Sequence, residues 1–409
     1  MSLSAVAAPA IGTGGGAGQL TLVGSQGGGP GLHQDGSVYL MNGSDTVWRE
    51  GSAESYFDVE RLPNGTLLAG FMQSGYSDCG PYDSPCTHTG YRLIDPDGPR
   101  VVGEYSYPVR STTNSEVHAA TPLPDGSVVV SDMEYERIFV RDEGEIVWEW
   151  RASSFYDAPD DPTTTDWLHI NDVDYIGEDR FLVSVRNANQ ILVVERGAGV
   201  VEVINEDRDD SDDGDCTRGS QLRDTDGDGD VRCGDPDLLS HQHNPQWLAD
   251  GSVLVADSDN DRIVELARTD NGTWERVWTL YGTGNLRFDW PRDADRLPNG
   301  HTLITDTFNS RVVEVDQRGR LVWAASTLRT PYEADRLPTA EPVGAPSAVG
   351  NGTIAPTATG DIPVLTELTF IAHAAVPELP FWFGEAQLAS VLLALLLAAT
   401  GLVAEARGW

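Results

Sequence analysis

One segment recurs along this chain and constrains its fold more than any other feature. Each copy consists of a short strand, a turn and a second strand of alternating apolar residues, and several turns are Asn-Gly or Asp-Gly. This pattern is typical of a β-hairpin, because glycine supplies the positive φ that a tight turn needs. The copies are separated by 61, 51, 74, 49 and 40 residues and begin at Phe57, His118, His169, His243, Arg292 and Tyr332.

Each complete hairpin is followed by two further strand-like runs. The third run has a shared form, as in ERIFVRD from Glu136 and DRIVELA from Asp261, and the fourth usually ends in tryptophan. Four short strands in each of six units predict an all-β fold, a six-bladed β-propeller. Seven blades is the alternative count. We expect the tryptophans that end the outer strands to pack between neighbouring blades, namely Trp150, Trp278 and Trp323.

The sixth unit is incomplete, because its inner strand near Tyr332 is followed by a Pro- and Gly-rich linker. Strand-like runs at 20–23, 37–41 and 46–48 precede the first hairpin. We expect these N-terminal strands to close the last blade, which removes the free edges of the ring. The predicted division is a Gly-rich segment (1–18), a propeller (19–345) with an Asp-rich insert (206–238), a linker (346–378) and a C-terminal helix (379–405).

The C-terminal helix is predicted to cross a membrane. Residues 388–404 form an uncharged run of 17 residues, which is just long enough to span a bilayer. Arg407 follows this run and favours an orientation with the tail inside and the propeller outside. We therefore expect a membrane-anchored protein whose propeller lies on the extracytoplasmic side. The N-terminus has neither the basic nor the long apolar region of a signal peptide.

Four cysteines fall into two close pairs, Cys79 with Cys86 and Cys216 with Cys233. Four cysteines permit three pairings, and local pairing is the simplest. Free thiols or a metal site are the alternatives, but the spacings suit neither a zinc ribbon nor a redox motif. Two disulfides in loop sequence favour an oxidising, extracytoplasmic location.

The net charge is −37, and all 27 basic residues are arginine. An acidic, lysine-free surface favours solubility in concentrated salt, where exposed charge is screened. We therefore expect a halophilic, archaeal source. Such a charge excludes a general nucleic-acid binder, because phosphate contacts need a basic patch.

The residues that open the hairpins are the candidates for chemistry. Eight residues before the turn glycine, the clearest copies carry Phe57, His118, His243 and Arg292, and His169 opens the third copy. Equivalent positions in a propeller form a ring at one mouth of the central channel. Three imidazoles there are compatible with a structural lining or with a zinc or iron site. Arg292 beside them would repel a cation and favours an anionic substrate instead.

Four segments resemble a known family: VHA around His118, DWLHIN at 166–171, SVR ending at Arg186 and QHN around His243. Over roughly residues 33–345 the chain resembles the arylsulfotransferase (aryl-sulfate sulfotransferase) family, and we expect a haloarchaeal-type member. The family consists of six-bladed propellers that move a sulfuryl group between phenols through a histidine intermediate. The resemblance implies small-molecule partners, an aryl sulfate and a phenol, with no cofactor required for the transfer.

Carried onto this sequence, the resemblance implies that His243 is the nucleophile. His118, His169 and Arg186 would hold the sulfuryl oxygens, and Asn171 would add a hydrogen bond. Arg292 and Trp167 are the expected substrate contacts at the mouth. His241, two residues before His243, leaves the choice of nucleophile open, although His243 keeps the register of the repeat.

The Asp-rich insert contains a possible calcium loop. Five aspartates have the loop spacing 1, 3, 5, 7 and 12, with glycine at position 6: Asp224, Asp226, Asp228, Asp230 and Asp235. A solvated acidic insertion is the alternative. The sequence leaves the oligomeric state open and supports two hypotheses: an aryl sulfotransferase, or a non-catalytic cell-surface propeller that binds or scaffolds other molecules.

Overall fold

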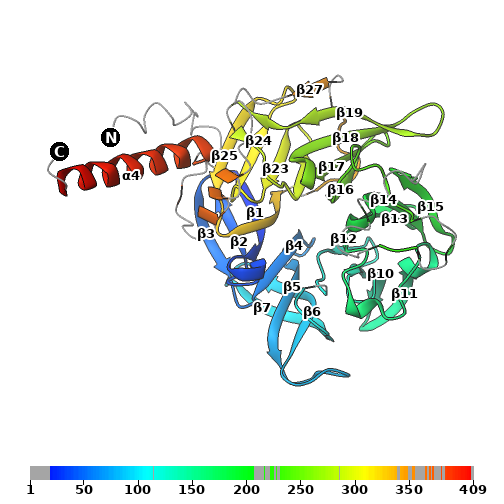
Figure 1. Cartoon of the computed structure of the whole chain (residues 1–409). Helices are drawn as coiled ribbons and strands as arrows, with labels where there is room; N and C mark the ends of the chain where they lie inside the picture. The colour runs from blue at the N-terminus through cyan, green and yellow to red at the C-terminus, as the bar shows by residue number, and fades with distance from the viewer. Residues whose placement is uncertain are drawn as a thin grey trace.

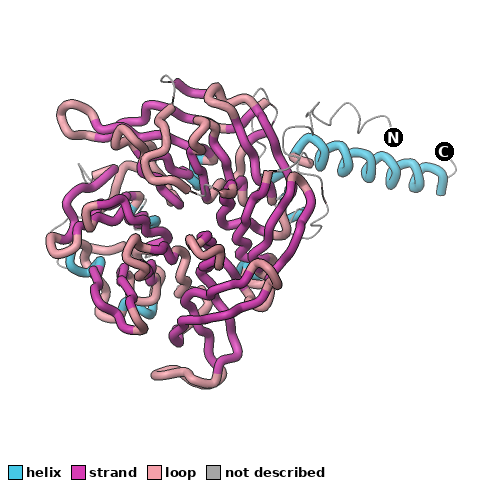
Figure 2. Tube along the Cα trace, turned by 180° about the vertical axis from the view of Figure 1, so that it is seen from behind, coloured by secondary structure: helices cyan, strands magenta, loops and turns pink. Residues whose placement is uncertain are grey.

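A computed structural model describes the fold from residue 19 to residue 406. The gaps in this described part are 114, 207–215, 217–221, 225–226, 228–230, 285, 339–340, 349–351, 355–363, 366–367, 370, 373–378 and 380–382. Within it, six antiparallel four-stranded blades surround a common axis (Figure 1). The predicted all-β, six-bladed propeller is confirmed. Seen from behind in Figure 2, the strands encircle the same axis, and the C-terminal helix lies outside the ring.

Five blades are built from strands that are consecutive in the chain. Each begins with an inner strand beside the axis and ends with an outer strand. Blade 1 comprises β4 (Ser55–Arg61), β5 (Leu67–Tyr76), β6 (Cys86–Asp95) and β7 (Arg100–Val109); blade 2 comprises β8 (Ala120–Pro122), β9 (Val128–Asp132), β10 (Arg137–Asp142) and β11 (Glu145–Arg151); blade 3 comprises β12 (Ile170–Gly177), β13 (Arg180–Val185), β14 (Gln190–Glu195) and β15 (Gly199–Ile204). Blade 4 comprises β16 (His243–Trp247), β17 (Val253–Asp257), β18 (Arg262–Arg268) and β19 (Trp274–Leu280); blade 5 comprises β22 (Asp293–Arg296), β23 (Thr302–Asp306), β24 (Arg311–Val315) and β25 (Leu321–Ser326).

Blade 6 closes the ring with strands from both ends of the propeller. Its inner strand, β26 (Thr330–Arg336), pairs with β1 (Leu20–Gly27), which is followed by β2 (Ser37–Asn42) and β3 (Asp45–Glu50). In this register Leu22 lies opposite Asp335 and Val23 lies opposite Ala334. The predicted closure by N-terminal strands is therefore confirmed.

Tryptophan and arginine join neighbouring blades. Trp278 and Trp323 are buried, and each stacks with an arginine of the next inner strand, Arg296 at 5.2 Å and Arg336 at 4.6 Å from the ring centroids. Both guanidinium groups also pair with a glutamate of the preceding blade; Arg296 lies 3.1 Å from Glu265. The expected packing of these tryptophans between blades is confirmed.

A buried Asp–Arg pair recurs at the turn between the second and third strands. In blades 2, 4 and 5 an arginine Nε donates to an aspartate Oδ2 at 2.6 Å, in the pairs Arg137–Asp132, Arg262–Asp257 and Arg311–Asp306. Blade 3 has Val185 and Gln190 at these positions. Its turn lacks this pair and instead carries Arg186.

The remaining elements lie outside the four-stranded blades. The disulfides Cys79–Cys86 and Cys216–Cys233 confirm the local pairings. Short elements are η1 (Pro30–Leu32), η2 (Ala152–Ser154), η3 (Pro162–Thr164), η4 (Arg186–Ala188), η5 (Ser258–Asn260), β20 (Gly282–Thr283), β21 (Leu286–Arg287) and β27 (Gly352–Ile354), which extends blade 4.

The C-terminal helix, α4, spans Glu385–Ala406 and projects away from the propeller in Figure 1. In the described part of the chain, no helix has both the length and the apolar character that crossing a bilayer requires. The predicted membrane anchor over 379–405 is therefore not supported.

Candidate active site

The residues that open the inner strands converge on Tyr332. The Tyr332 ring stacks on His118 at 5.2 Å and meets His243 edge-on at 6.1 Å between centroids. Phe57 packs against the same ring at 5.5 Å, and the Arg292 guanidinium lies 5.0 Å from its centre. Five blades therefore contribute to one cluster at a single mouth of the channel, as the hairpin register predicted.

Close approach of blades 1 and 2 positions His118. Gly70 lies on β5, and a Cβ at this position would be 2.5 Å from the carbonyl oxygen of Val117. Only glycine therefore lets the segment before β8 come this close to blade 1. The His118 ring then packs against Phe57 at 4.8 Å.

His169 joins the cluster from a left-handed backbone position. Its φ is +55°, and its ring stacks on His118 at 5.2 Å. It lies before β12, so it is not the register equivalent of the other openers. Asn171 occupies the equivalent position in blade 3. Asp172 pairs with Ser184 there in the way that Asp293 pairs with Thr305 in blade 5, so Asn171 corresponds to Arg292.

A carboxylate from blade 2 holds the strained turn at His169. Glu136 accepts the backbone N–H groups of Leu168, His169 and Ile170 at 3.0, 2.7 and 3.0 Å. Asp166 lies 2.8 Å from His169 Nδ1. Although burial opposes the effect, the charge and hydrogen bond of His169 hold the pKa of Asp166 below its usual range. Asp166 therefore orients the His169 ring.

Hydrogen bonds assign the proton of His243 to Nδ1. This nitrogen lies 2.8 Å from Ser258 Oγ and 3.1 Å from the carbonyl oxygen of His241. The Ser258 hydroxyl donates its own hydrogen to the carbonyl oxygen of Pro291 at 2.7 Å, so both neighbours of Nδ1 are acceptors. Nδ1 therefore carries the hydrogen, and Nε2 keeps a free lone pair.

The backbone before His243 is fixed to blade 3. Asn171 Nδ2 donates to the carbonyl oxygen of Gln242 at 2.9 Å. The Gln242 side chain is completely buried and donates to the carbonyl oxygen of Gln190 at 2.9 Å. These contacts connect Asn171 to the position of His243 through the backbone.

Burial controls the protonation of the two central histidines. It lowers the pKa of His118 well below its usual range, and the Glu116 carboxylate opposes part of this effect. Burial also lowers the pKa of His243 well below its usual range, and the charges of Arg292 and Arg186 lower it further. Both rings are therefore neutral at pH 7.

Two arginines supply positive charge that burial does not remove. Burial lowers the pKa of Arg292 to about 10, which leaves it charged at neutral pH. Arg292 donates to Gln26 and lies 4.3 Å from the Trp290 ring centre. Arg186 donates to Asn187 Oδ1 at 2.9 Å. Within the described residues, buried nitrogens without a hydrogen-bond partner include His118 Nδ1, Arg186 Nε and Arg292 Nε.

A cavity of about 850 Å³ reaches this cluster from the surface, with Arg292, Glu116 and His33 in its lining. His33 Nε2 lies 3.3 Å from Glu116. Burial alone would raise the pKa of Glu116, but the His33 hydrogen bond and the nearby imidazoles lower it to about 2. Glu116 is therefore an ionised, buried carboxylate at the edge of the cluster.

His241 lies apart from His243 and has its own carboxylate. Its Nδ1 is 2.6 Å from Asp259 Oδ2, and the other Asp259 oxygen accepts from Trp290 Nε1 at 2.7 Å. The backbone of His241 has a φ of +47°, and its N–H donates to Asn189 Oδ1 at 3.0 Å. The His241 side chain is 24% exposed, whereas His243 is buried.

Two expected features occupy other places. Trp167 is fully buried in the apolar core that blades 2 and 3 share, so it packs between blades rather than facing the mouth. Aromatic surface at the mouth comes from Trp290, Phe57 and Tyr332.

Of the calcium-loop aspartates, Asp226, Asp228 and Asp230 lie outside the described residues. No group of three or more metal-ligating side chains occurs in the part of the chain that is described, so the calcium site is not supported.

Sequence reasoning missed the supporting groups of the site. Glu136 and Asp259 come from segments that carry no hairpin opener, and only the folded chain brings them to the histidines; Glu116 stands two residues before His118. Glu136 begins the shared third-strand pattern, but its burial and its φ of +47° appear only in the folded chain.

One solved structure supports this fold, and two others resemble it more weakly. A solved structure of a protein of unknown function from Bacteroides caccae is 14% identical, with a TM-score of 0.53, and the match covers 79% of this chain and 100% of that chain. A putative 6-phosphogluconolactonase from Bacteroides fragilis is 11% identical, with a TM-score of 0.45, over 78% and 98% of the two chains. A catalytically inactive virginiamycin B lyase from Staphylococcus aureus is 10% identical, with a TM-score of 0.42, over 76% and 82%.

No curated protein matches the chain. A sequence model described as Arylsulfotransferase (ASST) matches residues 58–278, which is more than half of the 409 residues. The match includes the segments that carry His118, His169, Arg186 and His243. The chain therefore belongs to the arylsulfotransferase (ASST) family.

Proposed function

We propose that this protein moves a sulfuryl group from an aryl sulfate to a phenolic acceptor through a covalent intermediate on His243, without a nucleotide sulfate donor. The observation that carries the proposal is the set of N–H groups around His243. His118 Nδ1, Arg186 Nε and Arg292 Nε are buried and lack hydrogen-bond partners among the described residues. The two arginine Nε–H groups are buried donors, which are costly without partners, and the oxygens of a bound sulfate ester would satisfy them.

In the first half-reaction, the lone pair on His243 Nε2 attacks the sulfur. The new S–N bond forms as the bond from sulfur to the aryl oxygen breaks, and the electron pair leaves with the phenolate. Arg186 and Arg292 stabilise the negative charge that develops on the oxygens. His169, which Asp166 orients, donates a proton to the leaving phenolate as the general acid.

In the second half-reaction, the pair His241–Asp259 acts as the general base. Asp259 accepts the Nδ1 hydrogen, which leaves the lone pair of His241 Nε2 free to take the acceptor's hydroxyl proton. The acceptor oxygen then forms a bond to sulfur as the S–N bond breaks, and the electron pair returns to His243 Nε2. The proton on His241 then passes to water and His169 takes one up from water, which restores both side chains for the next cycle. The different surroundings of the two histidines support this division, since His243 is buried and neutral while His241 is partly exposed.

Two groups act through their neighbours. Asn171 holds the backbone of Gln242, and Glu136 holds the backbone of His169. We assign both as positioning residues. No cofactor enters either half-reaction.

The test uses the full chain with 4-nitrophenyl sulfate and phenol. We expect release of 4-nitrophenol, ping-pong kinetics and, without acceptor, a mass increase of one sulfuryl group on the peptide that contains His243. His243→Ala should remove both the release and the adduct. The matched control is His301→Gln, because His301 pairs with Glu314 outside the cluster, and this variant should retain activity.

Absence of 4-nitrophenol release from the folded wild-type chain would contradict the enzyme proposal and favour a non-catalytic binding propeller. An adduct on His241 instead of His243 would reverse the roles assigned to the two histidines.

We also propose that the protein works outside the cytoplasm in concentrated salt. Its two disulfides and its net charge of −37 without lysine support this location. Fractionation of the source cells, with thiol labelling before and after reduction, tests it; free cysteines in the native protein would contradict it.

A further inference from the structure

A second cavity, of about 810 Å³, lies at the other end of the channel. It is formed where the inner strands of blades 1 to 4 reach their hairpin turns, away from the histidines that open these strands. We call it the acidic pocket, after three lining residues: Glu60, Asp174 and Glu341. Its size is within the range of small-molecule sites.

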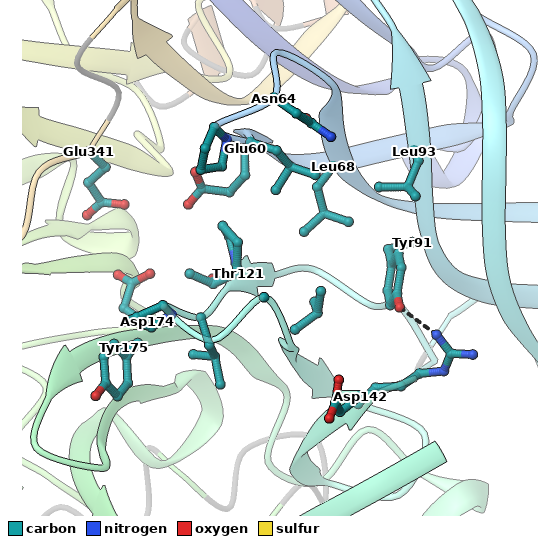
Figure 3. Close-up of a pocket in the computed structure, with 18 of the residues that line it drawn as sticks. Glu60, Asn64, Leu68, Tyr91, Leu93, Thr121, Asp142, Asp174, Tyr175 and Glu341 are labelled. Atoms are coloured by element: carbon teal, nitrogen blue, oxygen red, sulfur yellow. Dashed lines mark hydrogen bonds between the residues drawn. The ribbon is translucent and has the colours of Figure 1, made fainter. Parts of the chain in front are cut away.

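Three carboxylates converge at one side of the acidic pocket. Figure 3 shows the side chains of Glu60, Asp174 and Glu341 directed toward one another from separate segments. None of the three forms an ion pair with another described residue; Arg141, the basic member of the described lining, donates instead to the Tyr91 hydroxyl at 2.9 Å. The negative charges therefore face one another without a protein cation between them.

Two buried carboxyl groups without partners in the described part of the chain, Asp335 and Asp295, interact electrostatically with this group. Asp335 is 1% exposed, and neither of its oxygens has a hydrogen-bond partner within the described residues. The same holds for Asp295 Oδ2. Asp335 interacts with Asp174, Asp58 and Asp293 from three other inner strands, so it faces the channel axis. Leaving such groups buried and unsatisfied is costly, and a positive charge at the acidic pocket would offset that cost.

Burial and neighbouring negative charges also determine the protonation of Glu60, Asp174 and Glu341. Burial raises the pKa of Asp174 to about 7, and the charges of Asp58 and Asp293 add to this effect. Burial and neighbouring carboxylates likewise raise the pKa of Glu60 and Glu341 well above the usual range. A bound cation would reverse these shifts by stabilising the ionised forms.

The rest of the lining is apolar and favours an organic cation over a metal ion. Leu62, Leu68 and Leu93 supply aliphatic surface, and Tyr91 and Trp247 supply aromatic surface. Aromatic faces attract ammonium groups. In the described residues no three ligating side chains lie close enough to hold a metal.

We propose that the acidic pocket binds an organic cation, with its ammonium group among Glu60, Asp174 and Glu341 and its apolar body against the leucine and aromatic side chains. The site is separate from the histidine cluster. The proposal therefore stands independently of sulfuryl transfer.

The test is calorimetric titration of the full chain with benzyltrimethylammonium, with benzyl alcohol as the neutral control and calcium chloride as the metal control. We expect one benzyltrimethylammonium ion per chain and no measurable binding of the alcohol. Asp174→Asn should weaken binding by roughly tenfold. Asp142→Asn is the matched control, because Asp142 lines the same pocket away from the three carboxylates, and it should change the affinity by less than about twofold.

Asp174→Asn is expected to remain folded, because the substitution removes a charge that burial already disfavours; its melting temperature checks this. Saturation by calcium with loss of benzyltrimethylammonium binding would overturn the proposal in favour of a metal site. Equal binding of benzyl alcohol, equal weakening by the two variants, or no binding by the wild type would also overturn it. None of these readouts uses catalysis, so failure here is distinguishable from failure of the proposed sulfotransferase activity.

Discussion

The two ends of the channel have opposite electrostatic character, although the same inner strands line both. Phe57, Arg292 and Tyr332 lie at the mouth, and an acidic residue follows each of them three positions later: Glu60, Asp295 and Asp335. At about 3.3 Å per residue, only about 10 Å of strand separates the two layers. One end is therefore suited to an anion, and the other end to a cation.

Burial has the same effect at both ends, because it disfavours charge. It lowers the pKa of His118 and His243 and raises the pKa of Asp174 and Asp295. Histidines and carboxylates can become neutral by losing or gaining a proton, whereas an arginine remains charged at neutral pH. Arg186 and Arg292 are thus the permanent charges of the mouth, which identifies them as the main anion-binding groups.

Among the variants that test this contrast between the two ends, the largest effect is expected at Arg292. Arg292→Gln should lower kcat/KM for 4-nitrophenyl sulfate by on the order of 10²- to 10³-fold, because a neutral amide stabilises the developing negative charge less well. Steady-state kinetics at fixed salt measures the change. A loss below about tenfold would show that the mouth does not depend on this charge. Asp142→Asn, at the opposite end, should leave kcat/KM unchanged.

The hairpin register made the mouth predictable from the sequence. Positions counted back from a turn glycine repeat in the chain and therefore meet in space, which correctly brought together His118, His243 and Arg292. The acidic layer had an equally clear signal, because FDVE, NDVD, RDAD and YEAD begin at 57, 171, 292 and 332. This alternation also places Asn171, rather than His169, in register.

Other parts of the site were not predictable from local sequence. His169 reaches the cluster because Glu136, from another blade, holds its backbone, and no local pattern encodes that contact. Trp167 was expected at the mouth because of its motif, but its neighbours in space are the apolar residues of two blades. An apolar side chain is buried wherever the assembled blades form an apolar core. The position of that core depends on the packing of the blades and not on the local sequence.

The second largest effect is expected at His241. His241→Gln should lower the steady-state rate by about 10²-fold, because the acceptor loses its base. The first half-reaction should persist, so rapid mixing should still show a burst of one 4-nitrophenol per chain. Asp259→Asn should reproduce the slower steady state, and a more strongly ionised acceptor should partly rescue both variants. Loss of the burst would place His241 in the first half-reaction instead.

A smaller effect is expected when Asp335 or Asp306 is replaced, and the quantity that changes is the free energy of unfolding. Asp335 lacks hydrogen-bond partners among the described residues, whereas Asp306 is equally buried and accepts from Arg311 at 2.6 Å. Asp335→Asn should therefore raise the free energy of unfolding by about 1 kcal/mol, and Asp306→Asn should lower it by about 3 kcal/mol. Urea unfolding measures both. Destabilisation by Asp335→Asn would mean that the acidic layer holds the blades together.

The smallest effect is the pH dependence of stability, and its sign distinguishes the two ends. Burial raises the pKa of Asp174 and Asp293 to about 7, above the unfolded value of about 4. The folded chain therefore holds more protons, and the free energy of unfolding falls as the pH rises toward and through 7. The mouth histidines have the opposite effect on stability. Their pKa is lower in the folded chain than in the unfolded chain, so the free energy of unfolding falls only as the pH falls below about 6.5. Urea unfolding between about pH 6.5 and 8 measures this: stability should decrease with pH, and Asp174→Asn should flatten the slope, while Glu136, whose pKa burial raises to about 8, adds to the decrease from the mouth. An unchanged slope would mean that Asp174 titrates as an ordinary carboxyl group, and the contrast between the two ends would then rest on the arginines alone.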